Sequence, residues 1–299
     1  MKRVKPNPVP PVNPIWEYQA EGALLETYET YKRVLDVPWV GVVALAYARD
    51  SNFFGAWWAG LAPLAKTQAY RQACVDLRTR TEAAVAALAP PPIAGALREA
   101  GFSARERAAM REMLEVLSHG NFAQMPAVFL ARLALEGRVP HGCDAAPSTV
   151  CGAPPASRAP VAMPFVLMEP HHVLGDHAAL YDDIKRTIGL PFVNTDYRCL
   201  ARWPRYFQHA WSDLRPHIGT DAYERAAQAV HDDIVATSLA LPNVGGLDAD
   251  AVCAGAREDH AGDMHPTLAV TQLFTWLLPG LMLNVAFWRA QLLDDEAGA

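Results

Sequence analysis

The feature that most constrains this sequence is an internal repeat. When the sequence is shifted by 153 positions, residues 28–73 fall on residues 181–226 without a gap, and the two segments are identical at fifteen of forty-six positions. The identical pairs are Tyr28/Tyr181, Lys32/Lys185, Arg33/Arg186, Pro38/Pro191, Val40/Val193, Ala48/Ala201, Arg49/Arg202, Phe54/Phe207, Trp58/Trp211, Leu61/Leu214, Pro63/Pro216, Thr67/Thr220, Ala69/Ala222, Tyr70/Tyr223 and Ala73/Ala226. Most of them are apolar, aromatic or turn residues, as expected for two copies of one packing unit. The repeat therefore predicts a duplication, with two similar halves fused in one chain.

The two copies differ at one polar stretch. The second copy carries Asn194-Thr195-Asp196, and the first copy carries Gly41-Val42-Val43 at the same place. Asp196 could serve as the N-cap of the helix that follows, because Asp is well suited to that position. The first copy, however, forms the equivalent segment without a carboxylate. We therefore treat Asp196 as a candidate catalytic residue and keep the helix cap as the alternative.

Hydrophobic periodicity predicts an all-α fold. Apolar residues recur at helical spacing over most of the chain, and no useful length shows the alternation of a half-buried strand. Residues 39–47 are too short and apolar to separate strand from helix by periodicity, but Arg198 and Arg202, four apart in the other copy, favour a helix. The other predicted helices are 17–35, 53–64, 67–88, 93–100, 104–118, 122–136, 178–188, 205–214, 220–241, 248–257, and two apolar helices that meet at Pro279 and end at Leu293.

Composition divides the chain into four segments. Residues 1–16 form an N-terminal arm, 17–136 the first helical repeat, and 161–299 the second repeat, which carries Asp196. Residues 137–160 are rich in Pro, Ala, Ser and Gly and are predicted to link the repeats. We expect the two repeats to pack as a pseudo-dimer about a pseudo-twofold axis, with the active site between them.

Charge and cysteine content limit the partners of the chain. The net charge of −6 argues against nucleic-acid binding, because no basic stripe is present to neutralise phosphates. Five cysteines without a CxxC pair indicate a reducing cytoplasm, and the proline-rich N-terminus lacks the apolar core of a signal peptide. Residues 266–288 carry no charge, but polar residues and the Pro279-Gly280 break favour buried helices over a membrane span. The oligomeric state stays open, with a homodimer as the working expectation.

A second candidate for the chemistry is Asn121. His119-Gly120-Asn121 is predicted to be a tight connection between two apolar helices, which places Asn121 at a helix N-terminus. Its amide could cap that helix, or it could hold a water beside a carboxylate.

Metal and cofactor signatures are missing from the sequence. The histidine-rich stretches 171–177 and 258–265 lack the spacing of strong metal-ligand motifs, so no metal is predicted. GxSxG, GxxxxGK[ST] and GxGxxG do not occur, so no serine nucleophile, nucleotide or dinucleotide cofactor is predicted.

Several of these segments resemble one enzyme family. Val37-Pro38-Trp39-Val40, Gly120-Asn121, and Thr195-Asp196-Tyr197 followed by residues 200–204 are similar to segments of the group I 2-haloacid dehalogenases, as are the fused all-α halves. The resemblance covers about residues 21–292. These enzymes act on both D and L substrates. The resemblance implies hydrolysis of short-chain 2-haloacids to 2-hydroxyacids with inversion at C2, by direct attack of water, without a covalent ester or a cofactor.

The resemblance also implies roles for single residues. Asp196 is the base and Asn121 orients the attacking water. Trp39 lines the apolar halide side and Thr195 helps to hold the substrate carboxylate. The implied substrate-binding positions are Trp39, Val42, Gln124, Phe192, Thr195 and Tyr197. Val42 and Gln124 stand where family members carry Phe and Tyr, which implies a different substrate size. Arg71 stands where relatives carry a Glu paired with the residue at Thr67, so no role is implied for Arg71.

The residues themselves are compatible with this chemistry. Halide displacement needs a poised oxygen nucleophile, an apolar pocket for the halide and donors for a carboxylate. A helix beginning after Thr195 would offer backbone N–H groups to an anion. An aspartate of ordinary pKa, about 4, is a weak base, so positioning of the water by Asn121 is expected to matter more than basicity. The alternatives are a helical binding protein for small carboxylates, without catalysis, and a metal-dependent hydrolase.

Overall fold

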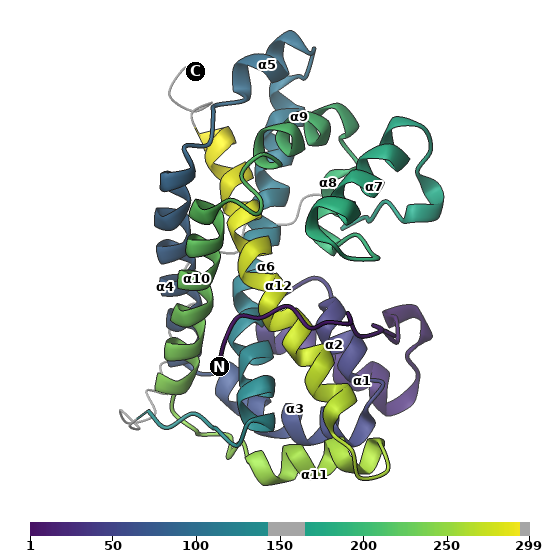
Figure 1. Cartoon of the computed structure of the whole chain (residues 1–299), viewed down its shortest axis with the longest axis vertical. Helices are drawn as coiled ribbons and strands as arrows, with labels where there is room; N and C mark the ends of the chain where they lie inside the picture. Colours follow the sequence, from purple (N-terminus) through teal and green to yellow (C-terminus); the bar gives the residue numbers. More distant parts are fainter. Residues whose placement is uncertain (143–164, 294–299) are drawn as a thin grey trace. The chain divides into compact units, whose positions relative to one another are not determined.

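The structure is a computed structural model that describes residues 1–142 and 165–293. Within these ranges every regular element is a helix, and the β-type pairing is limited to one isolated bridge between Gly142 and Pro242 (Figure 1). The all-α prediction is therefore confirmed. Most of the predicted linker, residues 143–160, lies outside the described residues.

The described helices follow the predicted ones closely at most boundaries. They are η1 Glu17–Gln19, α1 Gly22–Leu35, α2 Val42–Tyr47, α3 Ser51–Ala65, α4 Gln68–Val85, η2 Ala86–Leu88, α5 Ala94–Glu99, α6 Ala104–Leu135, η3 Pro170–His172, α7 Asp176–Ile188, α8 Thr195–Leu200, α9 Pro204–Leu214, α10 Asp221–Ala240, α11 Ala249–Asp259 and α12 His265–Leu293. Residues 39–47, for which the arginine spacing of the other copy favoured a helix, contain α2. A capping box opens α6: Ser103 Oγ accepts from Glu106 N at 3.2 Å and Glu106 Oε2 accepts from Ser103 N at 2.8 Å.

Helix boundaries recur at the offset of the sequence repeat. α2 and α8 begin and end 153 residues apart, and so do the first residues of α3 and α9 and of α4 and α10. Asp36 and Gly189, also 153 apart, both end their helices in the left-handed conformation. The local backbone plan thus follows the sequence repeat. The arrangement of two repeats about a pseudo-twofold axis stays a prediction.

The chain divides into two compact units. Unit 1 comprises residues 1–79, 120–154 and 228–279, and unit 2 comprises residues 80–119, 155–227 and 280–299. The divisions fall inside α4, α6, α10 and α12, so each unit takes residues from both halves of the sequence. The predicted domains, residues 17–136 and 161–299, stay a prediction about the sequence repeats.

Unit 1 is organised around α3. Figure 1 shows α1, α2 and α11 gathered with α3, and α11 makes the most extensive of these packings. Tyr47 on α2 meets Phe53 and Trp57 edge-on, with ring centroids 5.1 and 5.3 Å apart. Trp57 Nε1 donates to the carbonyl of Ala127 at 3.1 Å, which joins α3 to the second half of α6. Aromatic burial therefore holds the short α2 in place.

Unit 2 has an aromatic core of its own. The second half of α12 contributes Trp288, whose Nε1 donates to the carbonyl of Ala210 on α9 at 3.0 Å. Trp288 also meets Phe207 edge-on at 5.7 Å between ring centroids. All three residues are buried. This core carries α8, the helix of Asp196.

The predicted break at residues 119–121 is wrong. α6 runs without interruption from Ala104 to Leu135, and Asn121 lies in its interior instead of at a helix N-terminus. Gly120 disfavours a helix by only about 1 kcal/mol relative to Ala. Nearly every residue from 122 to 135 is buried, which outweighs that preference. Because no helix begins at Asn121, the alternative that its amide caps a helix is wrong.

The predicted helix boundary at Pro279 is also wrong. α12 is one helix from His265 to Leu293, with Pro279 inside it. An interior proline costs about 3 kcal/mol or more through a lost hydrogen bond and a ring clash. Residues on both sides of Pro279 are buried, and their burial offsets this cost. α12 is long and apolar enough to cross a membrane by length and composition, yet 72% of its most apolar window is buried inside the protein, as in a core helix.

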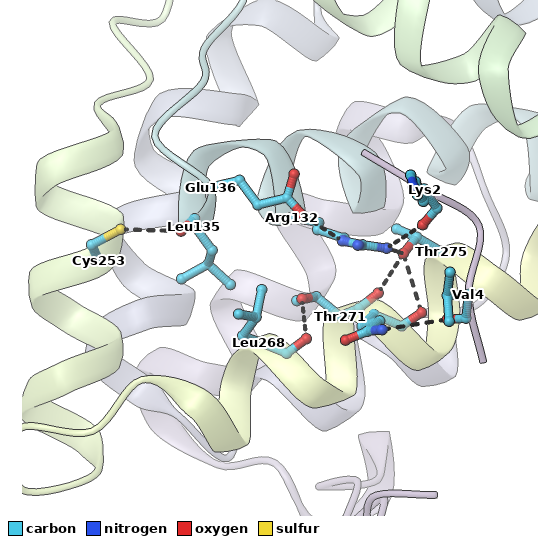
Figure 2. A network of polar contacts seen from close by, with 10 residues as sticks. Lys2, Val4, Arg132, Leu135, Glu136, Cys253, Leu268, Thr271 and Thr275 are labelled. Carbon is cyan, nitrogen blue, oxygen red and sulfur yellow. Dashed lines mark hydrogen bonds and ion pairs between the residues drawn. The ribbon is translucent and has the colours of Figure 1, made fainter. Parts of the chain in front are cut away.

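The N-terminal arm is tied to unit 1 by polar contacts (Figure 2). Arg132 on α6 donates through Nη1 to Thr275 Oγ1 at 2.8 Å and to the carbonyl of Lys2 at 3.4 Å, and through Nε to Glu136 at 2.9 Å. Gln272 Nε2 donates to the carbonyl of Val4 at 3.5 Å. The arm predicted for residues 1–16 thus has defined partners on α6 and α12.

Candidate active site

Asp196 lies in the first turn of α8. The N-cap residue of this helix is Asn194, with extended backbone geometry, and Thr195 and Asp196 are its first two helical residues. Asp196 is therefore not the N-cap residue, and the N-cap alternative for it is wrong. Its side chain is 2% exposed, a degree of burial that is rare for Asp outside paired or functional settings. The catalytic role of Asp196 stays a prediction, with which this burial is compatible.

A partly buried ion pair involves the same helix. Arg198, two residues after Asp196, donates through Nη1 to both carboxylate oxygens of Glu169 at 2.7 Å. Its Nη2 lies 3.5 Å from Thr195 Oγ1, a long hydrogen bond. The arginine is buried and Glu169 is partly exposed, on the segment that precedes α7. α8 is thereby anchored to a segment more than twenty residues earlier in the chain.

Tyr197 points into the core of unit 2. Its ring meets Trp211 and Trp288 edge-on and stacks on Phe207, with centroids 5.5 to 6.2 Å apart. Its hydroxyl oxygen accepts a hydrogen bond of 2.7 Å from Asn284 Nδ2 on α12. Burial raises the pKa of Tyr197 well above its usual value, so the phenol stays neutral. The prediction that Tyr197 lines the substrate site stays a prediction, because its described contacts are with the protein core.

Unit 1 holds the second group of predicted site residues. Trp39 is buried and its ring lies on Gly120 of α6, where an added Cβ would be 2.1 Å from Cη2 of the indole. Glycine is therefore required at position 120 for the close approach of this ring. Asn121, half-buried, is the next residue of α6. The structure thus brings Trp39 to the helix turn that carries Asn121.

Gln124 lies one turn further along α6 and faces α2. Its Oε1 accepts a hydrogen bond of 3.0 Å from the hydroxyl of Tyr31. A Cβ added at Gly41 would lie 2.0 Å from the same oxygen, so a larger residue there would have to displace the amide. Val42, the first residue of α2, is half-buried next to Gly41. The amide of Gln124 thus packs against the start of α2.

The predicted site residues thus form two groups. Trp39, Val42, Asn121 and Gln124 belong to unit 1, and Phe192, Thr195, Asp196 and Tyr197 belong to unit 2. Phe192 is half-buried, and Thr195 is half-buried beside the fully buried Asp196.

The histidine-rich stretches do not form a cluster of potential metal ligands in the described residues. Across residues 1–142 and 165–293, no group of three or more His, Cys, Asp or Glu side chains is placed to hold a metal ion. In the stretch 258–265, Asp259 accepts hydrogen bonds from Asn52 Nδ2 and from the backbone at the start of α3. Its role there is structural.

Sequence reasoning missed two partners of α8. Glu169 and Asn284 lie far from Asp196 in the chain, and no local pattern marks either of them. The available signal was the repeat itself, because Ala44 and Leu45 in the first copy stand opposite Tyr197 and Arg198. A polar replacement in one copy predicts a polar partner elsewhere, but it does not say which residue that partner is.

Comparison with known proteins identifies the family. No family model matches the chain. The chain is 37% identical over 256 residues to the (R)-2-haloacid dehalogenase of Rhizobium sp. (strain NHG3), covering 85% of this chain and 98% of that protein. It is 34% identical over 285 residues to the (R)-2-haloacid dehalogenase of Pseudomonas putida, covering 94% and 93%. It is 27% identical over 239 residues to a configuration-inverting 2-haloacid dehalogenase of Pseudomonas sp. (strain 113), covering 77% and 74%.

Solved structures agree with these relatives. The fold matches a D-2-haloacid dehalogenase in complex with L-LA with a TM-score of 0.87 and 31% identity, over 98% of this chain and 100% of that chain. A mutant D-2-haloacid dehalogenase with D-2-CPA matches with a TM-score of 0.86 over 97% and 99%. The similarity in sequence and fold extends over nearly the whole chain, and the protein belongs to the group I family of 2-haloacid dehalogenases.

Proposed function

We propose that this protein hydrolyses short-chain 2-haloacids to 2-hydroxyacids with inversion at C2. The single observation that carries the proposal is the nearly complete burial of Asp196 in the first turn of α8, in a chain that belongs to this family. Inversion is supported by the relative named as configuration-inverting. No cofactor enters the proposed reaction.

The proposed reaction is a direct displacement by water. Asp196 accepts a proton from water while the water oxygen forms a bond to C2, and the carbon–halogen bond breaks with its electron pair leaving on the halide. Asn121 orients the water, and Trp39 offers an apolar wall to the departing halide. Thr195 helps to hold the substrate carboxylate, and Val42, Gln124 and Phe192 set the size of the acid. This assignment requires the groups on α6 and α8 to act on one substrate.

The names of two relatives favour one enantiomer as the preferred substrate. The family resemblance implies activity on both D and L acids, whereas two relatives at 37% and 34% identity are named for the (R) enantiomer. We propose that the (R) acid is turned over faster than the (S) acid. Halide release from (R)- and (S)-2-chloropropionate, followed separately at equal enzyme concentration, measures this ratio. Equal rates or a preference for the (S) acid would contradict it.

An isotope experiment tests the mechanism. In a single turnover in ¹⁸O-water, direct attack places the label in the hydroxyacid product. An ester route would first transfer an unlabelled oxygen from an enzyme carboxylate and leave the label in the protein. Label found in Asp196 and absent from the first product would overturn direct attack. Binding of 2-haloacids without halide release from either enantiomer would instead favour the carboxylate-binding alternative.

A further inference from the structure

A buried polar network in unit 2 lies directly behind the proposed base. Asn284 Nδ2 donates to the hydroxyl oxygen of Tyr197 at 2.7 Å, and the hydroxyl of Tyr223 lies 2.8 Å from Asn284 Oδ1 and 3.0 Å from the carbonyl oxygen of Gly280. Tyr197, Tyr223 and Asn284 are all at most 4% exposed. These contacts join α8 and α10 to the second half of α12.

The position of Asp196 depends on such contacts because α8 is short. It has six residues, far fewer than the roughly 12–15 that an isolated helix needs for marginal stability. Its place is therefore set by the tertiary contacts of its side chains. Tyr197, the neighbour of Asp196, supplies several of these contacts, with three aromatic rings and with Asn284.

The first copy of the repeat lacks the side-chain pair formed by Tyr197 and Asn284. Ala44 on α2 stands 153 residues before Tyr197, and Ala131 on α6 stands 153 residues before Asn284. The register of α6 and α12 is supported by their interior prolines, Pro126 and Pro279, which are also 153 apart. Tyr70, the counterpart of Tyr223, donates to the backbone carbonyl of Ala123 at 2.9 Å, and the contact of Tyr223 with Asn284 is additional to its own backbone contact with Gly280.

The pairing of Tyr197 with Asn284 therefore occurs in the copy that carries the carboxylate, while the first copy has a different buried pair, Tyr31 with Gln124. A buried polar network is costly unless its members are paired, and alanine stands at the equivalents of both Tyr197 and Asn284. Resting on the proposed function, we propose that Asn284 and Tyr197 are positioning residues that hold α8 so that the Asp196 carboxylate meets the attacking water. This role is exerted through the backbone of α8, because the described contacts of both side chains are with the core of unit 2.

The test uses conservative variants of the full-length protein. Tyr197→Phe removes one hydroxyl and keeps the ring, and Asn284→Leu replaces the amide by an apolar group of similar size. A misplacement of about 1 Å can reduce turnover about 100-fold, so each variant is expected to lower kcat by about 10-fold or more and to change KM by less than about 3-fold. Because the two residues act as a unit, the double variant should be no slower than the worse single variant.

Matched controls separate positioning from stability. Tyr28→Phe removes a tyrosine hydroxyl that donates to the carbonyl of Ile15 at 2.8 Å in the first copy. Gln291→Leu removes a buried amide from the same helix as Asn284, where it donates to Asp213 at 2.7 Å. Both controls should lower Tm to a similar extent and keep kcat within about 2-fold of wild type.

The outcomes are distinct. Suppose that wild type releases halide, but that the Tyr197 and Asn284 variants keep kcat within about 2-fold or lose kcat only in proportion to their loss of Tm, as the controls do. The positioning inference is then wrong, while the proposed function stands. If wild type releases no halide from any 2-haloacid, the proposed function fails and the positioning role fails with it. If Asn284→Leu does not fold, the kcat of Tyr197→Phe decides whether the inference holds, because the Phe side chain keeps the aromatic packing of Tyr197.

Discussion

The indole ring of Trp39 lies on Gly120, so closely that a Cβ at position 120 would be 2.1 Å from Cη2 of the ring. This relationship links the loop before α2 to the turn of α6 that carries Asn121. An indole is rigid, and an added methyl group here must displace either the ring or the helix. The first prediction follows from this contact.

Gly120→Ala is expected to move Trp39 and to lower both stability and activity. Overpacking of this kind costs about 1–3 kcal/mol, and displacement of the halide wall should reduce kcat/KM by about 10-fold or more. Chemical denaturation and halide release measure the two effects. Gly55→Ala on α3 is the matched control, because nothing lies within 4 Å of the added Cβ, and it should be neutral or stabilising. Addition of Trp39→Phe should recover part of the lost stability but not the activity. Unchanged activity in Gly120→Ala would count against a role for Trp39.

Asp196→Asn is expected to abolish most of the activity without unfolding the protein. The amide keeps the shape of the side chain but cannot accept a proton from water, so kcat should fall by about 10²–10⁴-fold. Asn194, not Asp196, occupies the N-cap position of α8, and Asn can replace Asp in the first turn without loss of side-chain shape. Steady-state halide release and circular dichroism give the two readouts. Asp213→Asn, which changes a carboxylate on α9, is the control that should keep kcat, and a mild effect of Asp196→Asn would remove this residue from the mechanism.

Arg132→Met is expected to destabilise unit 1. Arg132 is 7% exposed and donates to Thr275, Glu136 and the backbone of Lys2. Hydrogen bonds to charged groups contribute about 1.5–3 kcal/mol each when buried, and the partly exposed Glu136 contributes less, so a loss of about 2 kcal/mol is expected. Urea denaturation measures it. Arg225→Met, outside this network, is the comparison, and equal stability of the two variants would show that the arm and α12 do not depend on Arg132.

His231 should make stability depend on pH in the acidic range. Burial lowers the pKa of His231 below its usual 6.5, and the charges of Arg132 and Arg3 act in the same direction. The hydrogen bond that His231 donates to the Asp232 carboxylate raises the pKa but does not outweigh burial. Its Nδ1 lies 2.9 Å from Asp232, and its buried Nε2 has no hydrogen-bond partner among the described residues. The unfolded chain therefore binds a proton more readily than the folded one. Stability contributed by the neutral ring is present above the unfolded pKa and is lost as pH falls below about 6.5 towards the folded pKa, by at most about 1.4 kcal/mol per pH unit.

His231→Asn should reduce that dependence, since it removes the titrating ring and keeps a donor for Asp232. Free energies of unfolding between about pH 7.5 and 5 in wild type and variant provide the measurement. His209→Asn, at an exposed position on α9, should leave the wild-type slope intact. Identical slopes for wild type and His231→Asn would show that His231 does not carry the effect.

Much of the fold could be predicted from local patterns. Helix-forming periodicity, the capping box at Ser103 and Glu106 and the apolar stretches around α3 and α9 are local signals, and the structure follows them. The two wrong boundaries share one physical reason. Gly120 and Pro279 disfavour helix by about 1 and 3 kcal/mol, while the burial of the residues around them favours it, and burial is a property of the tertiary fold that local sequence does not contain.

The features of the candidate site also divide into those that the sequence predicted and those that the tertiary structure decided. Comparison of the two copies within one sequence was enough to single out Asp196, because a carboxylate at one of two equivalent positions is a local difference. The burial of that carboxylate, the glycines that make room for Trp39 and Gln124, and the partners Glu169 and Asn284 were decided only by the tertiary structure. Glu169 precedes Arg198 by 29 positions and Asn284 follows Tyr197 by 87, and contacts at such separations are set by how helices pack, which no local pattern records.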